Sequence, residues 1–264
     1  MKYHIDTIPI WDAFKAGGEC PLCDIFFKIE GELVDRSLGG SVMEPDTRIQ
    51  VNKQGFCSEH LGQLYARQNR LGLALMMHTH LKEVIAALDG QEAELIKQME
   101  YDAKKGGLER AARAITKSAP SVQMTNDVAN IAHVRASGCH ICGRLDESME
   151  RYVATVVAMW DGEAAFKKAF KESKGFCLNH YSRLLDAGAR QLIGAKHREF
   201  TADILAAQRS GMERLEKELE WFTLKFDYRN RDKPWGESRD AIERVLLKLR
   251  SWPGLPGDKK DPAQ

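Results

Sequence analysis

Hydrophobic residues recur at three- and four-residue steps along most of the chain, which is the spacing of one face of an α-helix. This pattern predicts a helix that follows Cys23 and ends near Leu38, a long helix from about Cys57 to Leu88, and another long helix that begins near Cys177. We find no alternating hydrophobic and polar stretch long enough for a sheet. The sequence therefore predicts an all-α protein.

Glycine and proline mark the expected ends of these elements. Asp89-Gly90 is expected to end the first long helix, and Gly211 to extend or bend the second. The other expected elements are an extended arm at 4–10, a helical turn at 11–16, a loop at 39–45, a helix at 124–136, a short Lys-rich segment at 161–174 and a final helix at about 238–251.

The order of helices and motifs occurs twice, which indicates a duplicated helix pair. Ser118-Ala119-Pro120-Ser121 has the composition of a linker between the two halves. We expect a first half at 1–117, a second half at 118–210, C-terminal helices at 211–252 and a disordered tail at 253–264.

One pattern of cysteine and histidine appears in each half. A C-x2-C pair is followed downstream by G-F-C-x2-H, and the two sets use all six cysteines. Because each pair at a helix start directs two ligand atoms to one point, we predict two Cys3His metal sites that each staple one half. The expected ligands are Cys20, Cys23, Cys57 and His60 in the first half, and Cys139, Cys142, Cys177 and His180 in the second.

Three thiolates and one imidazole suit a tetrahedral Zn²⁺ ion, which gives two zinc ions per chain. Structural zinc can contribute about 10 kcal/mol or more of folding free energy. A [4Fe-4S] cluster is the alternative, and free or redox-active thiols are a third interpretation. Asp24 and Gly143 follow the C-x2-C pairs, where haem attachment needs histidine.

Other histidines are weaker candidates. His78 and His80 lie in a Met-Met-His-Thr-His stretch that resembles a copper motif, but on a helix they point about 200° apart, so packing is the better interpretation. His133 and His140 could compete with His180, although the parallel with His60 favours His180.

Two polar stretches could form binding sites. Glu44 and Asp46 near Arg48 could be an acid pair, but a loop with Asp46 as a helix cap is favoured. Near the C-terminus, a polar pocket could use Lys225, Asp227, Arg229 and Trp235, but an aromatic-anchored turn is favoured because such turns usually serve packing.

Composition narrows the possible partners and compartment. The 264 residues include 39 Lys and Arg against 38 Asp and Glu, so the net charge of +1 gives no strong nucleic-acid signal. No apolar run approaches the roughly 18 residues of a membrane span. The N-terminal stretch contains Asp6, Asp12 and Lys15 where a signal peptide would be apolar, so we expect a cytoplasmic protein.

The motifs together resemble an uncharacterised bacterial family that is common in anaerobes and is sometimes labelled an ABC transporter substrate-binding protein. The resemblance covers nearly the whole chain, and the family has no established activity. It rests on the cysteine motifs together with the stretches 4–9, 43–45 and 225–230 and with Trp235-Gly236. It implies that Glu44, Asp227 and Arg229 belong to the family pattern.

Three functions fit these observations. The first is a binding or assembly module with two structural zinc ions, whose partner is an unknown protein or small molecule. The second is an iron–sulfur or dithiol redox protein, with or without enzymatic activity. The third is metal delivery or sensing, in which one site is labile.

Overall fold

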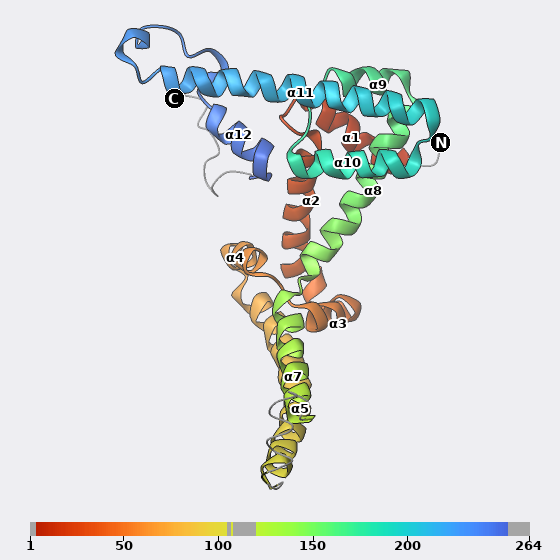
Figure 1. Ribbon diagram of the computed structural model, residues 1–264, viewed down its shortest axis with the longest axis vertical. Helices are drawn as coiled ribbons and strands as arrows, with labels where there is room; N and C mark the ends of the chain where they lie inside the picture. The colour runs from red at the N-terminus through yellow and green to blue at the C-terminus, as the bar shows by residue number, and fades with distance from the viewer. Residues whose placement is uncertain (1–3, 105–106, 108–119, 253–264) are drawn as a thin grey trace. The chain divides into compact units, whose positions relative to one another are not determined.

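The computed structural model describes residues 4–104, 107 and 120–252 (Figure 1). The described residues form helices joined by short connections and contain no strand, which confirms the all-α prediction.

The chain divides into two compact units. Unit 1 comprises residues 1–29 and 145–264, and unit 2 comprises residues 30–144. These units differ from the expected sequential halves, because α2 (Pro21–Leu38) and α8 (His140–Gly162) each begin in one unit and end in the other. The expected boundary between 117 and 118 and the expected tail at 253–264 lie outside the described residues.

Unit 2 contains a pair of long helices that lie side by side, α5 (Arg70–Ala103) and α7 (Pro120–Ser137) (Figure 1). The short elements η1 (Gly40–Val42), α3 (Pro45–Gln54) and α4 (Ser58–Ala66) precede this pair. The buried core of the unit consists of Val34, Leu38, Val42, Val51, Phe56, Leu64, Met76 and Ile141.

The helix expected from Cys57 to Leu88 is two helices, because Asn69 starts a new one. The Asn69 side chain accepts a hydrogen bond from the backbone N–H of Gly72 and donates to the carbonyl of Leu38. Conversely, α5 continues through Asp89-Gly90 to Ala103, so the expected stop there is wrong. A glycine costs a helix about 1 kcal/mol, and the packing of α5 against α7 outweighs that cost.

Within the described residues, α5 is long and apolar enough to cross a membrane by length and composition, and 17% of that stretch is buried. We expected no such segment from the sequence. Polar contacts join this part of α5 to α3. His80 Nδ1 donates to the carbonyl of Asn52, and Thr79 Oγ1 donates to the Asn52 side chain and accepts from Arg48. The helix is therefore tied to the other helices of unit 2 by hydrogen bonds.

Unit 1 contains α1 (His4–Ala16), α9 (Ala164–Lys171), α10 (Leu178–Gln191), α11 (Gly194–Leu224) and α12 (Ala241–Arg250), with short 3₁₀ turns η2 (Tyr228–Asn230) and η3 (Gly236–Ser238) (Figure 1). The extended arm expected at 4–10 is wrong, since α1 begins there despite Pro9. Trp11 and Phe14 of α1 pack on Phe166, with ring centroids 5.2 and 4.8 Å away, and this packing outweighs the local cost of proline.

Helix α11 continues through Gly211 without a break. The residue is glycine because the backbone at Lys174 occupies the space that a side chain would need. A Cβ at Gly211 would lie 2.0 Å from the carbonyl oxygen of Lys174. We expect Gly211→Ala to destabilise the protein by about 1–3 kcal/mol in chemical denaturation, as overpacking does. Gly90→Ala is the matched control, because nothing lies within 4 Å of its Cβ, and it should stabilise by up to about 1 kcal/mol. Equal effects of the two variants would contradict this packing.

Candidate metal centres

The eight cysteine and histidine ligands expected from the sequence gather in two groups, one in each unit. In each group the four ligand atoms lie within 4.8 Å of one another. Site 1, in unit 1, is Cys20, Cys23, Cys177 and His180. Site 2, in unit 2, is Cys57, His60, Cys139 and Cys142.

The pairing of the motifs is crossed, which corrects the expectation that each half would hold its own site. The C-x2-C pair of the first half meets the C-x2-H pair of the second, and the reverse holds for the other site. Loop closure costs only about 0.6 kcal/mol for each doubling of loop length, so the distance along the sequence could not decide the pairing. The tertiary fold decides it, because each C-x2-C pair lies in the same compact unit as the C-x2-H pair of the other half.

Site 1 is closed off from solvent. His180 Nδ1 lies 3.5 Å from Cys20 Sγ, 3.4 Å from Cys23 Sγ and 3.2 Å from Cys177 Sγ. The three cysteines are 0% exposed and His180 is 1% exposed. The imidazole therefore faces all three sulfur atoms through one nitrogen, as a metal ligand would.

Site 2 has the same arrangement of ligand atoms but is more exposed to solvent. His60 Nδ1 lies 3.2 Å from Cys57 Sγ, 3.3 Å from Cys139 Sγ and 3.4 Å from Cys142 Sγ, and the sulfur atoms of Cys57 and Cys142 are 3.8 Å apart. His60 is buried, but all three cysteines are half-buried. His60 Nε2 also lies 3.2 Å from the carboxylate of Glu30, a common outer partner of a metal-bound histidine. No sequence motif indicates a role for Glu30.

The glycine of each G-F-C motif is required by its surroundings. Gly55 has φ 62° and Gly175 has φ 82°, a region that favours glycine. A Cβ at Gly55 would lie 2.6 Å from the ring of His80, and one at Gly175 would lie 2.9 Å from the side chain of Gln208. The two loops thus pass closely against α5 and α11, which places Cys57 and Cys177 at the starts of α4 and α10.

Without a metal, thiols and thiolates coexist in each group. Burial, together with hydrogen bonding to Cys177, raises the pKa of the Cys20 thiol to about 12. Burial opposes ionisation of Cys139, but the hydrogen bond with His60 lowers its pKa to about 6. Burial also opposes the charge on His60, yet hydrogen bonds with Cys139 and Glu30 raise its pKa to about 10. A metal ion must therefore displace protons from Cys20 and from His60.

We expect metal affinity to weaken as the pH falls from 8 to 6. Cys20 and His60 hold their protons throughout this range when no metal is bound, because their pKa values lie above it. Each displaced proton makes the dissociation constant about tenfold larger per pH unit of decrease. Competition with a chromophoric chelator at pH 6, 7 and 8, corrected for the chelator's own protonation, measures this. An affinity that does not change with pH would contradict it.

The C-terminal residues that were weighed as a polar pocket lie in a turn, the interpretation that the sequence favoured. Lys225 is buried, and its ammonium donates to the carbonyls of Asn230, Arg231 and Lys233 while lying over the ring of Trp235. Asp227 accepts from the backbone of Arg229 and pairs with its guanidinium, which lowers the pKa of that carboxyl. The polar groups of Lys225, Asp227 and Arg229 thus have partners within the turn itself.

The remaining sequence candidates do not gather at a site. Glu44 rather than Asp46 occupies the N-cap position of α3 and is exposed, with its carboxylate accepting from Thr47. His78 is exposed while His80 is buried, as expected of residues that do not chelate together. His133 is exposed on α7, and His140 lies 3.3 Å from the side chain of Gln54, so neither replaces His180.

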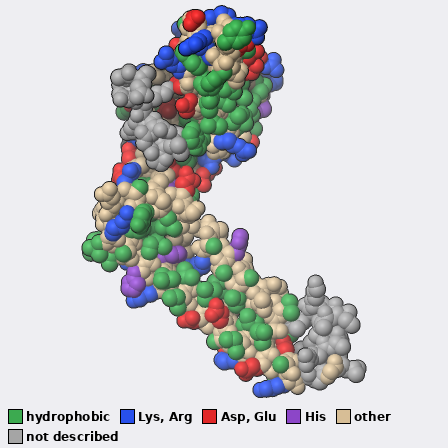
Figure 2. Space-filling model, turned by 90° about the vertical axis from the view of Figure 1, so that its left-hand side faces the viewer, with side chains coloured by type: hydrophobic (Ala, Val, Ile, Leu, Met, Phe, Trp, Pro, Cys, Tyr) green, Lys and Arg blue, Asp and Glu red, His purple; other side chains and the backbone are tan. Residues whose placement is uncertain are grey.

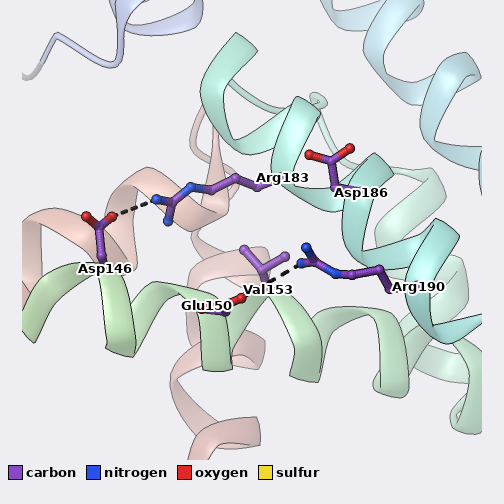
Figure 3. A pocket seen from close by; sticks show the side chains of 6 residues that line it. All are labelled: Asp146, Glu150, Val153, Arg183, Asp186 and Arg190. Carbon is purple, nitrogen blue, oxygen red and sulfur yellow. Dashed lines mark hydrogen bonds and ion pairs between the residues drawn. The ribbon is translucent and has the colours of Figure 1, made fainter. Parts of the chain in front are cut away.

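A charged pocket between α8 and α10 was not expected from the sequence. It is lined by Asp146, Glu150, Val153, Arg183, Asp186 and Arg190 (Figure 3). Arg183 pairs with Asp146 at 2.6 Å, and Arg190 lies 3.9 Å from Glu150. Two of the three acidic side chains that line the pocket thus pair with its two arginines.

Comparison with known proteins identifies the family but no activity. A family model described as a family of unknown function, DUF6062, matches residues 1–253. The chain belongs to the DUF6062 family. Searches of curated proteins and of solved structures found no significant match. For this DUF6062 member, the two groups of cysteine and histidine are therefore the features that indicate its chemistry.

Proposed function

We propose that this protein binds two zinc ions, one in each unit, and that the metal-stapled units serve as a binding or assembly module. The observation that carries the proposal is the crossed convergence of four ligands at each site. Each ion would join two segments that are far apart in the sequence and would fix the starts of two helices. Such a bond stabilises the folded state in proportion to the metal affinity.

The distances between ligand atoms support a single tetrahedral ion. With Zn–S near 2.3 Å and Zn–N near 2.0–2.1 Å, tetrahedral geometry separates two sulfurs by about 3.8 Å and a sulfur from a nitrogen by about 3.5 Å. The corresponding distances at site 2 are 3.8 Å and 3.2–3.4 Å. A [4Fe-4S] cluster places each ligand on a different iron and needs wider spacing. The geometry therefore favours zinc over the cluster.

A binding role is supported by two features. A zinc ion with four protein ligands has no open position for a substrate, so the sites favour architecture over catalysis. In addition, α5 exposes large hydrophobic side chains, and Figure 2 shows hydrophobic side chains at the surface of unit 2. Exposed hydrophobic surface of this kind is typical of contact with another protein. The exposed large hydrophobic residues on α5 are Leu71, Leu75, Leu81, Ile85, Ile96, Met99 and Tyr101.

Metal analysis of anaerobically purified protein, with an absorption spectrum, tests the proposal. We expect about two zinc ions per chain and no absorption near 400 nm, where iron–sulfur clusters absorb. A brown protein that contains iron and sulfide would contradict it.

A further inference from the structure

We propose that α12 makes site 1 chemically inert through Lys248 and Ser251, and that thiol-directed electrophiles therefore attack and open site 2 first. The inference rests on the proposed function, since it concerns the same two metal sites. It assigns Lys248 and Ser251 as positioning residues of site 1, and it assigns Cys57, Cys139 and Cys142 as the modification site of the chain.

Lys248 joins the two backbone segments that carry the ligands of site 1. Its side chain is 1% exposed, and its ammonium donates to the carbonyls of Glu19 and Lys174, each at 2.7 Å. Glu19 directly precedes Cys20, and Lys174 comes three residues before Cys177. The Glu19 carboxylate lies 3.6 Å from the same ammonium. Since zinc with three thiolates carries a net charge of −1, this buried cation stabilises the loaded site.

Ser251 holds an unusual backbone conformation that places its hydroxyl on a ligand. It lies in the left-handed region with φ 56°, which costs a residue other than glycine about 1–2 kcal/mol. There its Oγ donates to Cys177 Sγ at 3.1 Å. A hydrogen bond to a thiolate withdraws electron density from the sulfur and makes it a weaker nucleophile. The strained backbone at Ser251 thus coincides with a hydrogen bond to a candidate metal ligand.

Site 2 has different surroundings. Its three cysteines are half-buried, so a small reagent can reach them. At site 2 the charged group that contacts the histidine is an anion, the carboxylate of Glu30. At site 1 the neighbouring charged group is instead the cation Lys248. Negative charge and exposure both favour attack by a site 2 thiolate on an electrophile.

The chemical step can be written for a maleimide. With zinc bound, a cysteine Sγ would exchange its bond to the metal for a bond to one carbon of the maleimide C=C. The neighbouring carbon takes a proton from water, and the thioether that results no longer holds the metal. Zinc release therefore reports the attack.

The zinc content of the loaded protein is measured first. A content other than two ions per chain would contradict the proposed function, independently of the order in which the sites react. The protein is then treated with N-ethylmaleimide in the presence of a chromogenic zinc chelator. We expect two phases of release, with peptide mapping showing Cys57, Cys139 and Cys142 modified in the fast phase. Release of both ions in a single phase, with all six cysteines modified together, would overturn the inference.

The Ser251→Gly variant tests the part played by Ser251, since glycine also adopts the left-handed backbone and the variant loses the side chain that carries the hydroxyl. We expect the slow phase to become about tenfold faster, the change for losing a hydrogen bond to a charged group, while the fast phase stays the same. In cobalt-loaded protein the same variant should shift the thiolate-to-cobalt charge-transfer band. Gln68→Gly is the matched control, because Gln68 has φ 64° in unit 2 and should alter neither readout. A Ser251→Gly variant with an unchanged slow phase and spectrum would contradict the role of Ser251.

Discussion

Replacing Cys177 with serine is expected to remove the metal from site 1 and to abolish the cooperative unfolding of unit 1. Cys177 starts α10 and contacts His180 at 3.2 Å, and it is fully buried. Serine is a poor zinc ligand, so the variant loses a contribution of about 10 kcal/mol or more. The total stability of a domain is about 5–15 kcal/mol, so the loss is comparable with the whole.

Circular dichroism during thermal unfolding, with metal analysis of the same sample, measures this loss. Chelation of the wild-type protein should reproduce the effect at site 1. Ser182→Ala is the control on the same helix, since Ser182 is exposed and donates only to the local carbonyl of Asn179. A Cys177→Ser variant that keeps two metal ions and the wild-type transition would contradict the role of site 1.

Replacing Phe170 with alanine is expected to destabilise unit 1 by about 3–5 kcal/mol, the range for deleting a buried aromatic ring. Phe170 is 0% exposed, and its ring centroid lies 5.4 Å from that of Phe176 and 5.6 Å from that of Phe200. Since Phe176 belongs to the G-F-C motif, the cavity would also loosen the loop that positions Cys177.

Urea denaturation of the metal-loaded protein measures the change for Phe170→Ala. The control is Phe226→Ala, because that ring is 77% exposed and its loss should change stability by less than about 0.5 kcal/mol. A small effect of Phe170→Ala, similar to that of the control, would show that the aromatic cluster does not support site 1.

The fold class and all the residues of the two candidate metal groups could be predicted from the sequence, because each rests on a local pattern. Helical spacing identifies helices, and the C-x2-C and C-x2-H pairs identify ligands, whatever the tertiary fold. The helix from His4 to Ala16 could not be predicted in this way, since its stability comes from packing on Phe166. The break before Asn69 was also missed, because it depends on a cap that reaches Leu38.

The pairing of the ligands required the structure. Cys20 and Cys23 could close a site with either C-x2-H pair at similar entropic cost, so the choice depends on which pair the tertiary fold places in the same unit. The outer contacts of Glu30, Lys248 and Ser251 also join positions that no sequence spacing relates. Local patterns thus identify the candidate ligands, and the tertiary fold determines which of them would share an ion.

Metal counting in paired serine variants tests the crossed arrangement most directly. Native mass spectrometry of Cys23→Ser/Cys177→Ser should find one metal ion per chain, because both changes fall in site 1. The same measurement of Cys23→Ser/Cys57→Ser should find none, because one change falls in each site. The opposite outcome, with no ion in the first variant and one in the second, would show that each half holds its own site and would contradict the account.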